Sequence, residues 1–276
     1  MGSKEISVIG VGVIDFLVGA VDEKLFKLDG QDVDYMKFSF GGDALNEAIA
    51  LARLGKKVHW ISKVGDDDAG HKILNYAAEN GVDISGVKVE ADLETAVTVV
   101  LVDKQGERRF LTNPRSSLRK LALEDILPHV DDMAQIVSFA SMFISSLLDA
   151  SAMEKLFKRI KASGRTLAVD MKCSKNGETL KDLAGVLSSV DYFFPNEFEL
   201  STLTGETDVQ KNIETLLESG LKCAVVKRGG EGCIIATKSA QIEIPAYRVE
   251  KVIDTTGAGG LFCGGLFMGV VGKLGA

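Results

Sequence analysis

The chain of 276 residues has few cysteines and prolines, four of each, and no uninterrupted apolar run of about 18 residues. A membrane-spanning helix is therefore not expected, and Lys4 and Glu5 lead into the first apolar stretch without the pattern of a signal peptide. No CxxC pair and no histidine at zinc-ligand spacing accompanies the cysteines, so we expect reduced thiols in a cytoplasmic protein: Cys173, Cys223, Cys233 and Cys263.

Positive charge is also scarce. The sequence has 32 Lys and Arg against 39 Asp and Glu, which gives a formal net charge of −7. A protein that binds nucleic-acid phosphates needs a clustered excess of Lys and Arg. The composition therefore predicts a small-molecule partner, and neither nucleic acid nor a membrane.

Strand-like and helix-like segments alternate along most of the chain. Residues 6–13 form an apolar run rich in branched side chains, which is typical of a strand buried on both faces of a parallel sheet. Apolar residues then recur at helical spacing over 42–54, and residues 58–64 resume as a strand. The same alternation returns at 136–139, 152–162, 166–170, 192–194, 208–219 and 224–227. We predict an α/β fold with a doubly wound, mostly parallel sheet.

Two stretches, about 16–40 and 95–112, break this alternation. In the second, β-like residues flank Lys104-Gln105-Gly106 as they would in a hairpin. Both stretches suit a small β-sheet lid over one end of the main sheet, and we predict one domain over residues 1–276 that carries this lid. Exposed lid strands are edges that invite pairing, so a homodimer formed through the lids is also predicted.

A glycine-rich turn, Asp254-Thr255-Thr256-Gly257-Ala258-Gly259, precedes an apolar run that can start a helix, and residues 247–253 before it are expected to form a strand. Unpaired backbone amides and the helix dipole at such a turn favour a transferring phosphoryl group. The alternative is an ordinary strand-to-helix turn, which short glycine motifs do not exclude.

Paired glycines, Gly41 and Gly42, stand before the helix that carries Asn46, and they admit a polar ligand against the backbone. The amide of Asn46 can both donate to and accept from sugar hydroxyls. Asp15, expected just past the first strand, lies where open α/β sheets bind ligands. An exposed Asn and a capping Asp are the ordinary alternatives for these side chains.

Two further loops follow strands at the same end of the predicted sheet. Asn196 and Glu199, after the strand at 192–194, can organise a hydrated Mg²⁺, although helix capping by Asn196 is the alternative. The segment from Lys227 to Gly232 joins two apolar strands through a glycine turn with a positive charge beside it, and a plain hairpin would look similar.

These five elements, taken in chain order, extend over nearly the whole sequence. They resemble the ribokinase-like (PfkB) carbohydrate kinases, whose two signatures match residues 41–70 and 254–262. The resemblance implies ATP-dependent phosphorylation of a sugar hydroxyl, with Mg²⁺ and a monovalent cation such as K⁺. It assigns Asp15, Gly41, Gly42 and Asn46 to the sugar, Lys227, Gly229, Gly230 and Gly232 to ATP, Asn196 and Glu199 to Mg²⁺ and phosphate, Gly257, Ala258 and Gly259 to an anion hole, and Asp254 to the monovalent cation.

The chain departs from the family pattern at the position of the catalytic base. The motif continues with an Asp that takes the proton of the sugar hydroxyl, whereas this sequence has Gly260. Since glycine cannot accept a proton, we predict severely reduced turnover, which Gly260→Asp should restore. The chain also ends soon after this motif, so the C-terminal helices are expected to be truncated, with a cost to ATP affinity.

Other departures leave the sugar unnamed. Asp43 stands where ribokinases often carry Lys, Lys172 falls in a segment where many relatives have an Asn, and Ser141 and Arg109 can equally be structural. Ribose, fructose and keto-deoxy acids remain candidates. A Rossmann dehydrogenase is disfavoured because Asp15 replaces the last glycine of its motif. The serious alternative is a sugar- or nucleotide-binding relative without catalysis.

Overall fold

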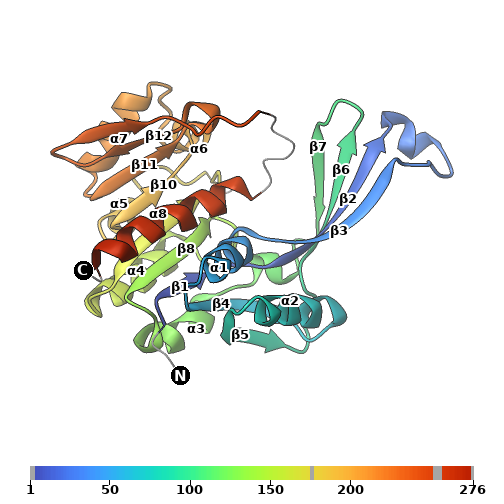
Figure 1. Ribbon diagram of the computed structural model, residues 1–276, viewed down its shortest axis with the longest axis horizontal. Helices are drawn as coiled ribbons and strands as arrows, with labels where there is room; N and C mark the ends of the chain where they lie inside the picture. Colours follow the sequence, from blue (N-terminus) through green and yellow to red (C-terminus); the bar gives the residue numbers. More distant parts are fainter. Residues whose placement is uncertain (1–3, 175–176, 251–256, 275–276) are drawn as a thin grey trace.

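The computed structural model describes residues 4–174, 177–250 and 257–274, and a nine-stranded sheet forms its centre (Figure 1). Pairing is parallel from β5 to β11, and only β12 and β13 run antiparallel to their neighbours. The order across the sheet is β13 (Gln241–Ile244), β12 (Cys233–Ala236), β11 (Cys223–Lys227), β10 (Tyr192–Phe194), β9 (Thr166–Met171), β8 (Ile136–Met142), β1 (Ile6–Ile9), β4 (Val58–Gly65) and β5 (Asp83–Glu90).

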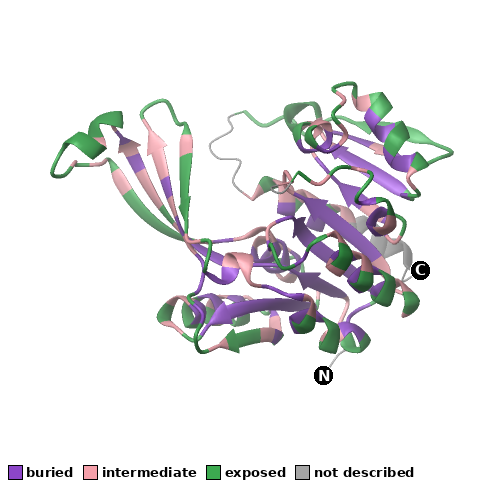
Figure 2. Cartoon of the chain, turned by 180° about the vertical axis from the view of Figure 1, so that it is seen from behind, coloured by how far each residue is buried: buried purple, intermediate pink, exposed green. Residues whose placement is uncertain are grey.

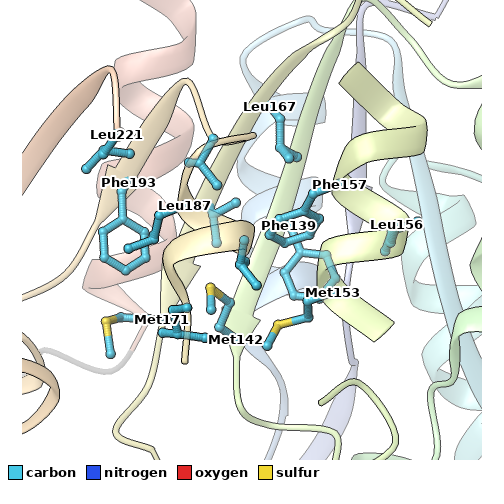
Figure 3. Close-up of a cluster of buried hydrophobic side chains, with 14 of the residues drawn as sticks. Phe139, Met142, Met153, Leu156, Phe157, Leu167, Met171, Leu187, Phe193 and Leu221 are labelled. Atoms are coloured by element: carbon cyan, nitrogen blue, oxygen red, sulfur yellow. The ribbon is translucent and has the colours of Figure 1, made fainter. Parts of the chain in front are cut away.

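Helices cover both faces of this sheet, as its buried apolar strands require. One core contains residues of α1 (Asp43–Arg53), α2 (Asp68–Glu79) and α8 (Ala258–Leu274). The other contains residues of α3 (Leu123–Ile126), α4 (Ala150–Ala162), α5 (Ala184–Leu187), α6 (Glu197–Thr204) and α7 (Val209–Glu218). In the second core the rings of Phe139 and Phe157 meet edge to face with centroids 5.1 Å apart (Figure 3). The predicted doubly wound fold is confirmed.

A four-stranded sheet projects from the main body (Figure 1), and much of its surface is exposed or half-buried (Figure 2). Its order is β3 (Tyr35–Gly41), β2 (Val13–Val21), β6 (Val97–Asp103) and β7 (Arg108–Thr112). The β2–β6 pair is parallel and the outer pairs are antiparallel. We call this sheet the lid. Short 3₁₀ turns complete the chain: η1 (Glu23–Lys27), η2 (Ser117–Arg119), η3 (Leu127–Asp132) and η4 (Gly229–Glu231).

The first predicted strand is too long. β1 ends at Ile9 and Val13 already belongs to the lid, so Asp15 lies within β2 and not just past β1. The break falls at Gly10, whose φ is 145°, and where a Cβ would lie 2.9 Å from the carbonyl oxygen of Ala140. The apolar run concealed this turn because Val11 and Val13 continue its hydrophobicity.

The prediction of a strand over 247–253 is also wrong for the residues of this segment that the structure describes. β13 ends at Ile244, Pro245 follows, and residues 246–249 form no regular element, with Tyr247 92% exposed. Proline has no N–H to donate to a strand ladder, which accounts for the end of β13. Residues 251–253 lie outside the described residues. Within the described ranges, no helix is long and apolar enough to cross a membrane.

Candidate active site

A cleft of about 640 Å³ opens between the lid and the main body. Asp15 contributes to its wall from β2, Gly42 and Asn46 from the start of α1, and Gly257 from the turn before α8. These residues lie far apart in the sequence. The family resemblance assigns the first three to the sugar and Gly257 to the anion hole. Gly41 pairs with Val13 across β2 and β3, and a Cβ at Gly41 would collide with the Asp15 carboxylate.

Asp15 is the lid's acidic group in this cleft. Burial, and next the negative charge of Asp43, raise the pKa of its carboxyl to about 6. A carboxyl with that pKa is still largely ionised at neutral pH. Asp15 can therefore accept hydrogen bonds from two hydroxyls of a bound polyol.

A second acid of the cleft belongs to a network that the sequence did not reveal. Asp43 is the first residue of α1, and its carboxylate accepts a hydrogen bond from the Ser141 hydroxyl and lies 3.2 Å from the Lys172 ammonium. Burial works against the charge of Lys172, but the carboxylates around it, Asp43 and then Asp170, together outweigh burial and raise the pKa of Lys172. Ser141 has a φ of 64°, which is uncommon for a residue other than glycine.

The lid places a different arginine in the cleft from the one considered in the sequence. Arg108 lines the cleft together with Phe110, whereas Arg109 lies in a separate hollow near η1. Because side chains alternate across a strand, neighbouring residues of β7 face opposite sides of the lid. The sequence shows two adjacent arginines in this strand. Which of them faces the cleft depends on the register in which β7 pairs with β6.

The turn at Gly257, Ala258 and Gly259 begins the 17-residue helix α8. Gly257 has a φ of 78°, and a Cβ there would lie 3.3 Å from the Asn46 amide nitrogen. A Cβ at Gly259 would lie 3.7 Å from the Lys227 ammonium. The helix N-terminus, the amide of Asn46 and a lysine thus converge, as an anion site requires.

Gly260 is buried against the start of α1. A Cβ at this position would lie 3.1 Å from the carbonyl oxygen and 3.8 Å from the Cα of Asp43. The first of these contacts is tight but needs a shift of only a few tenths of an ångström. The site can therefore accept a side chain at position 260 beside Asp43.

Lys227 ends β11 and is mostly buried. Its ammonium lies 2.6 Å from a carboxylate oxygen of Asp170, which is 3% exposed. Burial opposes the ammonium charge, but the neighbouring Asp170 carboxylate raises the pKa of Lys227 above its ordinary value. The residue is thus a fixed cation beside Gly259, although the sequence did not indicate its partner.

Asn196 and Glu199 form the N-terminal cap of α6. The Asn196 side-chain oxygen accepts from the Glu199 backbone N–H at 2.8 Å, and the Glu199 carboxylate accepts from the Asn196 N–H at 2.9 Å. The capping alternative is therefore present in the structure. Among the described residues no cluster of three His, Cys, Asp or Glu could hold a metal ion. These two residues fit Mg²⁺ only through water molecules and ligand oxygens.

Three predicted glycines of the described chain do not line the cleft. Gly229 and Gly230 lie in η4, and Gly232 follows with a φ of 94°, so that a Cβ there would collide with the backbone of Ile244 and Ala246. This turn connects β11 to β12, next to Lys227. Asp254 lies outside the described residues.

Comparison of the sequence with known proteins identifies its family. The family model described as pfkB family carbohydrate kinase matches residues 3–273. The chain belongs to the pfkB family of carbohydrate kinases. Fructokinase-2 of Zea mays is 32% identical over 238 residues, which are 83% of this chain and 70% of that protein.

Solved structures show the same fold. The structure of a fructokinase with bound ATP from Xylella fastidiosa superposes with a TM-score of 0.81 at 25% identity, over 98% of this chain and 82% of that one. An Arabidopsis thaliana ribokinase complexed with ribose and ATP also gives 0.81, at 21% identity, over 98% of this chain and 86% of that one. The family and the fold inferred from the sequence motifs are confirmed.

Proposed function

We propose that this chain is an ATP-dependent sugar kinase whose cleft holds a sugar hydroxyl at the N-terminus of α8. The observation that carries the proposal is the meeting of Asp15, Asn46 and Gly257 in one cleft of about 640 Å³. An acid and an amide suit the hydroxyls of a sugar, and the helix start suits a phosphoryl group. The fructokinase from Xylella fastidiosa, which was solved with ATP, supports the choice of nucleotide.

ATP would extend from the start of α8 toward the β11–β12 turn. Lys227 lies beside Gly259, and Gly229, Gly230 and Gly232 form the turn that follows Lys227. Mg²⁺ would be held between phosphate oxygens and waters near Asn196 and Glu199, where it supplies positive charge to the phosphates. K⁺ near Asp254 remains part of the proposal on the resemblance alone.

The residue at position 260 distinguishes an active kinase from a binding protein without catalysis. With no acid at this position, sugar and nucleotide binding can persist while proton removal is weakened, so a binding protein without catalysis is the second candidate. Phosphoryl transfer also needs positioning of the reactants and an anion hole. Both are compatible with the geometry of the site.

A pair of matched variants tests the proposal. Phosphoryl transfer from ATP is measured against fructose, ribose and a keto-deoxy acid for the parent chain, Gly260→Asp and Gly265→Asp. Gly265 lies on the same helix but is exposed with open space around it, so it controls for an added carboxylate. We expect Gly260→Asp alone to raise kcat, by roughly 10²-fold. Sugar binding by calorimetry with no turnover in any variant would favour the binding protein instead.

The lid supports the proposed dimer. It exposes Phe16, Phe38 and Phe110, with 43%, 46% and 63% of their surfaces accessible. Exposed aromatic residues on a small sheet are typical of a surface that is covered in an assembly. Multi-angle light scattering should give twice the chain mass, and Phe38→Glu should restore a monomer; a parent chain that is already monomeric would contradict this part of the proposal.

A further inference from the structure

We infer that Asp43 accepts the proton of the sugar hydroxyl in this chain, in the role that an acid at position 260 would otherwise have. The inference rests on the proposed kinase function. Gly260 abuts Asp43: a Cβ at position 260 would lie 3.8 Å from the Asp43 Cα. The backbone of Asp43 thus adjoins position 260, and Asp43 lines the same cleft as Gly257 at the start of α8.

The cleft offers few carboxylates for this role. Of the described acidic residues, Asp15 and Asp43 line it. Glu47, the other acid near α8 on α1, is 0% exposed, and Asp170 is 3% exposed and bound to Lys227. A base must reach the proton it removes, directly or through one water, so Glu47 and Asp170 are unsuited.

Geometry selects Asp43 over Asp15. Asp15 belongs to the lid strand β2, whereas Asp43 begins α1, the helix against which α8 packs. The phosphoryl group is expected at the start of α8, and the hydroxyl that attacks it must lie next to that point. Asp43 adjoins Gly260 there, and Asp15 is left to orient other hydroxyls from the lid side.

Two neighbouring groups hold the Asp43 carboxylate in place. Ser141 donates a hydrogen bond to it from the end of β8, and the Lys172 ammonium lies 3.2 Å away, just after β9. Both donors lie on the main body and not on the lid. These two contacts restrict the orientation of the carboxylate from the main-body side of the cleft.

The step is a single proton and phosphoryl transfer. The Asp43 carboxylate takes the proton of the sugar hydroxyl as that oxygen bonds to the γ-phosphorus of ATP. The bond from this phosphorus to the β–γ bridging oxygen breaks, and ADP leaves with the electron pair. The products are the sugar phosphate, ADP and a protonated Asp43, which returns its proton to solvent.

A double-mutant cycle tests the inference. The parent chain, Asp43→Asn, Gly260→Asp and the double variant are compared by kcat and KM with the best sugar. We expect Asp43→Asn to lower the kcat of the parent by roughly 10-fold or more. In the Gly260→Asp background, where the new acid takes the proton, the same change should lower kcat by less than about 3-fold.

Two further variants keep the outcome interpretable. Ser141→Ala leaves the Asp43 carboxylate in place but removes its donor, and it should lower kcat of the parent only and leave KM unchanged, even if Asp43→Asn folds poorly. Asp15→Asn should raise KM equally in both backgrounds.

The inference is overturned by equal losses from Asp43→Asn in both backgrounds, or by a parent chain that is inert while Gly260→Asp turns over. Inactivity of both the parent and Gly260→Asp would instead refute the proposed kinase function, and the inference with it.

Discussion

A buried carboxyl on α1 makes the stability of this protein depend on pH. Glu47 is 0% exposed, and neither oxygen of its side chain makes a hydrogen bond of ordinary length and angle within the described part of the chain. Burial raises the pKa of Glu47 from 4.5 to about 8. The Ser138 hydroxyl and the charge of Lys227 act in the opposite direction, while the carboxylates of Asp170 and Asp43 add to the rise.

The sign of the effect follows from the two pKa values. The folded state keeps the Glu47 proton in the range where the unfolded state has lost it, so this contribution to stability is fully present below pH 4.5 and declines as pH rises toward 8. At pH 7 the difference corresponds to about 3 kcal/mol, because one pKa unit is worth about 1.4 kcal/mol and the folded side chain is still mostly neutral.

Glu47→Gln removes this titration with little change of shape. We expect the variant to be more stable than the parent by about 3 kcal/mol at pH 7 and by less than about 1 kcal/mol at pH 5. The corresponding rise in Tm at pH 7 is roughly 5 to 10 °C. Urea unfolding followed by circular dichroism at pH 5, 6, 7 and 8 measures the difference.

The matched control is Glu218→Gln, since Glu218 is exposed at the end of α7 and the same chemical change there removes a carboxylate that is not buried. The reasoning is refuted if the stability of Glu47→Gln relative to the parent does not grow between pH 5 and pH 8.

Three further perturbations have definite expected outcomes. Burial lowers the pKa of the fully buried His59 from 6.5 to about 4, so its contribution to stability is lost as pH falls from 6.5 toward 4; His59→Leu should move the acid-unfolding midpoint to lower pH, and an unchanged midpoint would count against this. Lys227→Met leaves Asp170 buried without its cation and should cost about 3–5 kcal/mol in urea unfolding, largely recovered when Asp170→Leu is added. Gly232→Ala should cost about 2 kcal/mol or more because of its φ of 94° and the collision with the strand-end backbone; a neutral effect would show that the turn can relax.

Local patterns predicted most of the fold. The helical spacing of apolar residues over 42–54 corresponds to α1, and the turn at Gly106 lies between the lid strands β6 and β7. These features depend on residues close in sequence, whose side-chain period and turn chemistry fix the local structure. The boundary between β1 and β2 was missed because two valines around Gly12 extend the apolar run across the break.

The site was predicted where motifs mark it and missed where long-range pairing forms it. Asp15, Asn46 and Gly257 were identified and do meet in the cleft. The link from Asp43 to Ser141 and Lys172 joins α1, β8 and the loop after β9, so no local spacing could reveal it.

Glu47 was missed for a different reason. In a helix, a Glu ordinarily predicts an exposed position, because burial of an unpaired carboxylate is costly. Its burial follows from the packing of α8 against α1, where a Cβ on Gly264 would lie 3.7 Å from the Glu47 Cγ. That contact between two distant helices is a property of the fold, which single-residue preferences cannot predict.

Steady-state transfer of phosphate from ATP to sugar, measured for the parent chain and Gly260→Asp after calorimetry has shown that both bind the same sugar, tests the central claim most directly. The account predicts equal sugar affinity within a few fold and a kcat that is roughly 10²-fold higher with the acid at position 260. Equal sugar affinity with no gain in kcat would contradict it, because a carboxylate at position 260 would then not assist removal of the proton.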